Sequence, residues 1–208
     1  MQPTRAETKQ RTQSRVIDVA GRLFEQRGYA ATSVRAIADS AGVSVGTVMS
    51  VGDKRALLVK VFDRHILREH EGRVSPPAGP DHDPSGSRDG SDAGACPDRL
   101  ATLAAPFVAL FTRRDDLART YASILVSGDH ESSLFSDLAA RLTSEFRVVI
   151  TEHGCTRPED ASAQAGALYF AYVGLLFTAS ARRTSDAAAL STDLRGAFAA
   201  ICACNKAA

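Results

Sequence analysis

The chain has 208 residues, of which 44% are hydrophobic and 24% are charged, a composition typical of a folded protein rather than of a disordered one. The formal net charge of +1 excludes a uniformly polycationic nucleic-acid-binding protein, but the charge is unevenly distributed. Residues 1–75 carry 13 Lys and Arg against 8 Asp and Glu, whereas residues 76–208 carry 12 against 16. This asymmetry is typical of one module that binds a polyanion and a second module that does not.

Several classes of protein are disfavoured by what the sequence lacks. The first 30 residues contain no apolar stretch of the kind found in secretory signals, so we expect a cytoplasmic protein. Four cysteines in a chain with enough apolar residues for a core predict free thiols rather than a disulfide framework. Residues 161–181 carry no formal charge, but seven alanines make them weakly apolar for a membrane span. They predict a helix buried on several sides, and no membrane as a partner.

Residues 75–97 form the clearest boundary in the chain. Of these 23 positions, 17 are Pro, Gly, Ser or Asp, and none is a large apolar residue. Such a segment buries too little surface to offset the entropy of ordering it, so it predicts a flexible linker. We therefore expect two domains, residues 1–74 and residues 98–208.

The first domain shows apolar residues at helical spacing and no useful strand pattern. The predicted helices are one that ends near Gly28, one between Thr32 or Ser33 and Gly42, one over about 45–51, and one from Lys54 to about Glu71. Before them lies a basic lead-in, which fits a contact to DNA and a solvated tail equally well; it consists of Arg5, Lys9, Arg11 and Arg15.

The second domain shows the same helical periodicity, so the sequence predicts an all-α fold throughout. Apolar stripes run over about 100–111, 117–125 and 134–150, from Pro158 to about Arg183, and over 190–201. Within the first of these, Pro106 is expected to kink or restart the helix, and Pro158 is expected to open the charge-free one.

The turn Ala41-Gly42-Val43-Ser44 between two short helices is the most informative feature of the sequence. Gly42 tolerates a left-handed backbone, Val43 can fill the angle between the helices, and Ser44 can cap the helix that follows. Helices joined in this way form a helix-turn-helix, whose second helix can lie in the major groove of DNA. The small residues Val45, Gly46 and Thr47 would let that helix approach base edges closely.

Residues 15–62 resemble the DNA-binding domain of the tetracycline-repressor (TetR) family of bacterial regulators. The matching residues are Ala20, Leu23, Phe24, Gly28, Tyr29, Thr32 to Val34, Ile37, Ala38, Ala41 to Ser44, Gly46, Thr47, Lys54, Leu57 and Leu58. The resemblance implies a homodimeric repressor with an amino-terminal three-helix domain. It also implies a carboxy-terminal helical domain that binds a small effector and dimerises through its last two helices.

From the turn and this resemblance we predict which residues contact operator DNA. They are Thr32, Ser33, Arg35, Ser44, Val45, Gly46, Thr47, Met49, Ser50 and Lys54. The resemblance places Lys54 against a phosphate. The sequence departs from the family over residues 48–53, Val-Met-Ser-Val-Gly-Asp, which are one residue shorter than usual and lack the aromatic residues found there. Met49 and Val51 can preserve the packing. The resemblance implies that a family tyrosine in this segment binds the DNA backbone through its hydroxyl, and this chain lacks that hydroxyl.

Aromatic residues of the second part are candidates for lining an effector pocket, with core packing as the alternative. They are Phe107, Phe111, Tyr121, Phe146, Tyr169 and Tyr172. The charge-free helix is apolar on both sides, which calls for cover from its own domain and from a second copy of the chain. The predicted dimer contacts are Ala167, Phe170, Gly174, Phe177, Leu194, Phe198 and Ile201.

The sequence shows no catalytic motif, metal site or cofactor site. Cys202 and Cys204 are two residues apart and point to different faces of a predicted helix, which disfavours a chelating pair and leaves a redox sensor as an alternative. We therefore predict a ligand-responsive transcriptional regulator, a repressor rather than an enzyme, that binds a near-palindromic operator as a dimer. The alternatives are a helical ligand-binding protein or enzyme with a decayed helix-turn-helix, and a helical adaptor.

Overall fold

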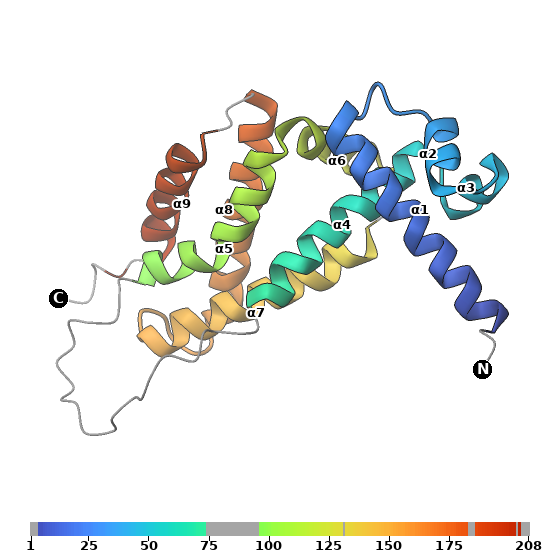
Figure 1. Cartoon of the computed structure of the whole chain (residues 1–208). Helices are drawn as coiled ribbons and strands as arrows, with labels where there is room; N and C mark the ends of the chain where they lie inside the picture. The colour runs from blue at the N-terminus through green and yellow to red at the C-terminus, as the bar shows by residue number, and fades with distance from the viewer. Residues whose placement is uncertain (1–3, 74–95, 131, 183–185, 203, 205–208) are drawn as a thin grey trace, which may run out of the picture. The chain divides into compact units, whose positions relative to one another are not determined.

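A computed structural model describes residues 4–73, 96–130, 132–182, 186–202 and residue 204 (Figure 1). These residues form helices and no strand, so the prediction of an all-α fold is confirmed. The helices are α1 (Arg5–Arg27), α2 (Val34–Ala41), α3 (Val45–Val51), α4 (Lys54–Arg73), α5 (Cys96–Arg113), α6 (Asp115–Ser127), α7 (Ser133–His153), α8 (Ala161–Arg182) and α9 (Ala187–Cys202). Most of the predicted linker lies outside the described residues, although its last two positions, Cys96 and Pro97, already belong to α5.

The chain divides into two compact units, and their composition differs from the predicted domains. The first unit comprises Met1–Ile66 together with Arg113–Phe135, and the second comprises Leu67–Thr112 together with Ser136–Ala208. The boundary near residue 66 falls inside α4, and α6 belongs to the same unit as the amino-terminal helices.

Helix α1 begins well before its apolar stripe, because a capping box fixes its start. The Thr4 hydroxyl accepts a hydrogen bond from the Glu7 backbone N–H at 3.2 Å, and the Glu7 carboxylate accepts one from the Thr4 backbone N–H at 2.6 Å. The basic lead-in from Arg5 to Arg15 is therefore helical rather than a tail. Farther along, Val16, Ala20 and Phe24 are buried on the inner side of the helix.

The first unit has an apolar core built from α1, α2, α3, α4 and α6. Its fully buried large side chains are Phe24, Ile37, Leu57, Leu58, Phe62, Tyr121 and Ile124. Tyr121 of α6 stacks on Phe62 of α4 with ring centroids 4.5 Å apart, and its hydroxyl donates to Asp63 Oδ1 at 2.9 Å. Burial raises the pKa of Asp63, while hydrogen bonds from Ser132 and Tyr121 oppose this shift. These contacts explain why α6 belongs to the first unit.

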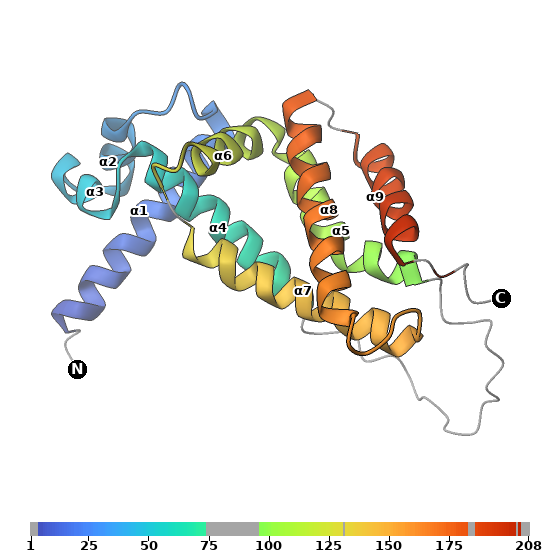
Figure 2. The ribbon, with the colours of Figure 1, turned by 180° about the vertical axis from the view of Figure 1, so that it is seen from behind.

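The second unit contains α5, α7, α8 and α9. Pro106 lies inside α5 and does not restart the helix, and the ribbon of α5 bends along its length, in line with the predicted kink (Figure 1). Helix α8 begins at Ala161 rather than at Pro158, which lies in the preceding turn. Helices α8 and α9 lie side by side (Figure 2). Phe146 of α7 packs edge-on against Phe198 of α9, with ring centroids 5.4 Å apart. This unit therefore has a core of its own.

Candidate nucleic-acid interface

Local backbone contacts fix the turn between α2 and α3. Gly42 is left-handed, with φ 62° and ψ 42°, and its N–H donates to the carbonyl oxygens of Ala38 and Asp39. Two residues later, the Ser44 hydroxyl accepts a hydrogen bond from the Thr47 N–H at 3.1 Å and so caps α3. The predicted roles of Gly42 and Ser44 are confirmed, and the two helices form a helix-turn-helix.

Helix α3 buries one side chain and leaves its other face exposed. Val48 is completely buried, whereas Val45 and Met49 are 46% and 50% exposed. Exposed Gly46 and Ser50 lie on the same helix. A Cβ added at Gly46 would meet no atom nearer than the Ser44 hydroxyl at 3.8 Å, so protein packing does not require glycine at this position. The exposed face is therefore slim and available to a partner.

A groove of about 580 Å³ lies between α1 and α3. It is lined by Arg5, Thr8, Lys9, Thr12, Gln13, Thr47, Ser50 and Val51. Arg5 and Lys9 are exposed, and neither forms an ion pair with any residue that the structure describes. The groove thus combines two free cations from α1 with hydroxyl groups from α3, which is a surface suited to an anionic backbone.

Lys54, the predicted phosphate contact, is held in place by two interactions at the start of α4. Its ammonium lies 4.3 Å from the centroid of the Tyr29 ring and donates to the carbonyl oxygen of Ala30 at 3.3 Å. The pKa of Tyr29 is raised, mainly by burial. An ammonium has three donors, so these contacts orient Lys54 and leave donor capacity for a phosphate.

The other residues predicted to contact DNA divide into exposed and buried positions. Arg35 is exposed, and Ser33 is exposed while its hydroxyl caps α2 by accepting from the Ala36 N–H at 3.1 Å. The structure corrects the prediction for Thr32. Its side chain is 1% exposed, and its hydroxyl donates to the carbonyl oxygens of Leu23 and Gly28. Thr32 therefore joins α1 to the start of α2 and offers no side chain to a partner.

Residues 48–53, which lack the aromatic residues usual in the family, make a tight contact at Gly52. A Cβ at Gly52 would lie 2.8 Å from the Cβ of Ala56, so only glycine fits between α3 and α4. Asp53 then caps α4 by accepting a hydrogen bond from the Ala56 N–H at 2.7 Å. The short connection thus holds α3 against α4 without a ring.

The aromatic residues predicted to line an effector pocket are not all in one unit. Tyr121 lies in the first unit and bonds to Asp63, whereas the others lie in the second. Phe107, Phe111, Phe146 and Tyr172 are buried there, and Phe107 contacts His70 with ring centroids 4.6 Å apart. Tyr169 is half-buried, and burial raises its pKa to about 12. These positions fit core packing at least as well as a pocket lining, which was the predicted alternative.

The predicted dimer contacts also divide into two groups. On α8, Phe170 is 73% exposed, Ala167 and Gly174 are exposed, and Phe177 is half-buried. On α9, Ile201 is half-buried, but Leu194 and Phe198 are 2% and 0% exposed inside their own unit, which corrects the prediction that these two residues are dimer contacts. The exposed residues among the predicted dimer contacts thus lie on α8. Among the described helices, α8 also has the length and composition of a membrane span, a property that buried helices of non-membrane proteins share.

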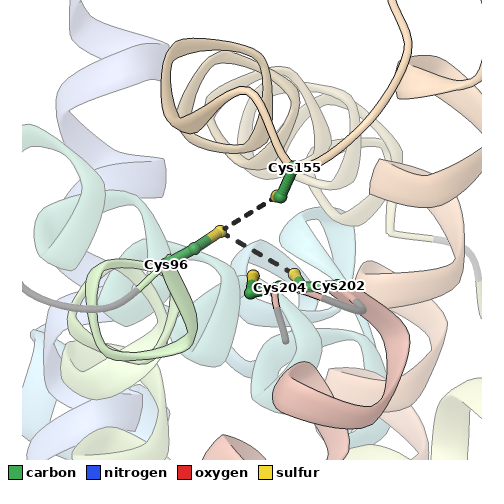
Figure 3. A group of neighbouring side chains, drawn as sticks. All are labelled: Cys96, Cys155, Cys202 and Cys204. Atoms are coloured by element: carbon green, nitrogen blue, oxygen red, sulfur yellow. Dashed lines mark hydrogen bonds between the residues drawn. The ribbon is translucent and has the colours of Figure 1, made fainter. Parts of the chain in front are cut away.

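The structure brings together four cysteines that the sequence did not associate. Their Sγ atoms all lie within 4.8 Å of one another, and the residues are Cys96, Cys155, Cys202 and Cys204 (Figure 3). The prediction that Cys202 and Cys204 point apart assumed one continuous helix, but α9 ends at Cys202. Sequence spacing offers no signal for this cluster, because three separate segments supply it.

Comparison with known proteins supports the assignment of the helix-turn-helix. Residues 16–50 match the family described as bacterial regulatory proteins of the tetR family. No curated protein sequence matches the chain significantly.

Two solved structures share the fold over most of their length. One is a TetR-family transcriptional regulator from Streptomyces coelicolor, with a TM-score of 0.56 and 20% identity over 92% of this chain and 80% of that chain. The other is described as the molecular basis for control of antibiotic production by bacterial hormones, with a TM-score of 0.55 and 20% identity over 90% of this chain and 95% of that chain. We therefore identify residues 16–50 as a TetR-family helix-turn-helix domain, in a chain that has the fold of TetR-family transcriptional regulators.

Proposed function

We propose that the protein is a cytoplasmic transcriptional repressor that binds operator DNA as a homodimer and is released by a small-molecule effector. The observation that carries this proposal is the exposed face of α3, on which Val45, Met49 and Ser50 surround Gly46. A helix of this kind can enter the major groove, where its methyl groups meet thymine methyls and its hydroxyls meet base edges.

The groove between α1 and α3 supports an additional contact to the DNA backbone. Arg5 and Lys9 line it together with Thr47 and Ser50. In this proposal the two cations neutralise phosphates while α3 reads the bases, so that the amino-terminal extension of α1 supplies affinity and α3 supplies sequence choice. These backbone contacts would take over from the tyrosine hydroxyl that the segment after Thr47 lacks.

The exposed face of α8 supports the homodimer. Phe170 is the most exposed aromatic side chain named on this helix, and Ala167 and Gly174 beside it are small enough for close approach of a second helix. A dimer built in this way places two recognition helices about 34–36 Å apart, or a multiple of this, on a near-palindromic operator.

Release by an effector requires that the ligand bind one dimer arrangement better than the other. We place the effector in the second unit, among the aromatic residues around Phe107 and Tyr172, and we assign the protein a binding role rather than a catalytic one. Helix α4 is the candidate transmitter, because the boundary between the units falls within it.

A gel-shift titration against the DNA upstream of the protein's own gene tests the proposal. We expect a retarded complex at low salt that unrelated DNA of equal length does not displace. Thr47→Ala and Lys54→Ala should each weaken the complex, whereas Lys60→Ala on the same helix as Lys54 serves as a charge-matched control and should not. Absence of sequence-preferring binding at low salt would contradict the proposal and favour a ligand-binding protein with a decayed helix-turn-helix.

A further inference from the structure

The four cysteines of the second unit form a compact cluster around a common centre (Figure 3). The Cys96 Sγ lies 3.8 Å from the Cys202 Sγ and 3.7 Å from the Cys155 Sγ, and all four Sγ atoms lie within 4.8 Å of one another. All four are free thiols. A disulfide would need about 2.05 Å between its sulfurs, so these distances describe an assembled but unbonded group.

The spacing of the sulfurs suits one tetrahedral metal ion. With Zn–S bonds of about 2.3 Å, tetrahedral geometry separates neighbouring sulfurs by roughly 3.8 Å. The two measured distances of 3.7 and 3.8 Å match this edge. An iron–sulfur cluster would place several atoms between the thiolates and hold them farther apart.

Three separate segments of the chain aim their sulfurs at this point. Cys96 is the first residue of α5, and Cys202 is the last residue of α9, with Cys204 two positions beyond it. Cys155 follows Gly154, which leaves α7 with a φ of 71° and so turns the chain back. The cluster therefore links the start of α5, the end of α7 and the end of α9.

We propose that Cys96, Cys155, Cys202 and Cys204 bind a single Zn²⁺ ion that fastens the end of α9 to α5 and α7. Zn²⁺ displaces the four thiol protons to solvent and forms four Zn–S bonds, with no change of oxidation state. A site with four protein ligands has no open position, so its role is structural.

The arrangement of the cysteines favours metal binding over a redox-active disulfide pair. A disulfide joins two sulfurs, whereas here four sulfurs converge on one point, which is the number that a tetrahedral Zn²⁺ site uses. Cys96 and Cys202 are buried, whereas Cys155 and Cys204 are half-buried, so an ion can enter from the side of the latter two.

Metal analysis of the full-length chain, purified in the presence of reductant, tests the proposal. We expect one zinc per chain, together with the thiolate-to-metal charge-transfer absorption of a tetrahedral site when Co²⁺ replaces Zn²⁺. Cys155→Ser and Cys204→Ser are the variants to test. Because both ligands are half-buried, these two positions should tolerate substitution better than the buried Cys96 and Cys202. Each should lower the affinity for Zn²⁺ by at least about 100-fold, because loss of groups outside the ligand shell already costs up to that much.

Thr156→Ala is the matched control, since it alters the neighbour of a ligand and should retain one zinc. Added Zn²⁺ should raise the thermal midpoint of the wild-type chain and of Thr156→Ala, but not that of either cysteine variant. Circular dichroism establishes that the variants remain helical. Zinc retained by both cysteine variants, Co²⁺ spectra without thiolate bands, or disulfide formation by a reduced chain that takes up no metal would each overturn the proposal.

Discussion

Helices α3 and α8 both expose apolar side chains, but the two surfaces differ in what they can bind. On the seven residues of α3, Val45 and Met49 are about half exposed and alternate with glycine and hydroxyl-bearing residues. On the 22 residues of α8, the exposed side chains include Phe170, which is 73% exposed, with Tyr169 5.9 Å away between ring centroids. A small, mixed surface suits the polar edges of bases, whereas a large aromatic one suits another protein.

Of the substitutions considered, a charge introduced on the exposed face of α8 should have the largest effect on dimerisation and on operator binding. Phe170→Asp would bury an unpaired carboxylate in the proposed dimer, at a cost of about 3–5 kcal/mol. We expect the dissociation constant of the dimer to rise by roughly 100-fold or more, as measured by analytical ultracentrifugation, with loss of operator binding.

Val126→Asp is the matched control, because Val126 is a similarly exposed apolar residue, 75% exposed, on α6 of the other unit. It should leave the dimer unchanged. A Phe170→Asp chain that remains dimeric would show that α8 is not the dimer interface. It would also contradict the inference that the exposed face of α8, unlike that of α3, binds another protein.

Two threonines distinguish the exposed face of the helix-turn-helix from its interior. Thr32→Ala leaves the carbonyl oxygens of Leu23 and Gly28 without their buried donor, so it should lower the free energy of unfolding by about 1–3 kcal/mol in denaturant titrations. Thr47→Ala should change stability by less than about 0.5 kcal/mol and weaken operator binding instead. The reverse pattern would place Thr32, not Thr47, at the surface that binds DNA.

Two glycines make a second matched pair. Gly52→Ala places a Cβ 2.8 Å from that of Ala56 and should destabilise the first unit by about 1–3 kcal/mol. Gly46→Ala makes only an ordinary van der Waals contact with the Ser44 hydroxyl at 3.8 Å, and it should preserve or raise the thermal midpoint, because alanine is favoured over glycine within a helix. Its effect should appear in operator affinity, where the added methyl group blocks close approach. Equal stability of the two variants would contradict the packing described for Gly52.

The smallest effects on operator binding are expected from substitutions in the groove between α1 and α3. Arg5→Ala and Lys9→Ala should each weaken operator binding uniformly across sequences and reduce the slope of log affinity against log salt by about 1. Titrations at several salt concentrations measure this slope. Arg68→Ala on the exposed surface of α4 serves as a control. An unchanged slope in both variants would show that the groove does not contact phosphates.

The accuracy of the sequence-based predictions varied with the range of the contacts involved. Helices α2 and α3 were predicted to within a residue, because Ser33, Gly42 and Ser44 act on groups only a few positions away. The start of α1 was missed, although the Thr4 and Glu7 capping box was present, because the apolar stripe begins only at Val16. Leu194 and Phe198 were predicted as dimer contacts but are buried within their own unit, since periodicity identifies an apolar face but not what covers it.

The sequence by itself determined the all-helical class, the helix-turn-helix and the exposed residues of α3, because helix periods, caps and a left-handed glycine depend on neighbouring residues. Only the tertiary structure decided that Thr32 is buried, that α6 joins the first unit through Tyr121 and Asp63, and that four cysteines meet. Each of these depends on segments that are distant along the chain and are brought together by burial of apolar surface, which no local pattern encodes.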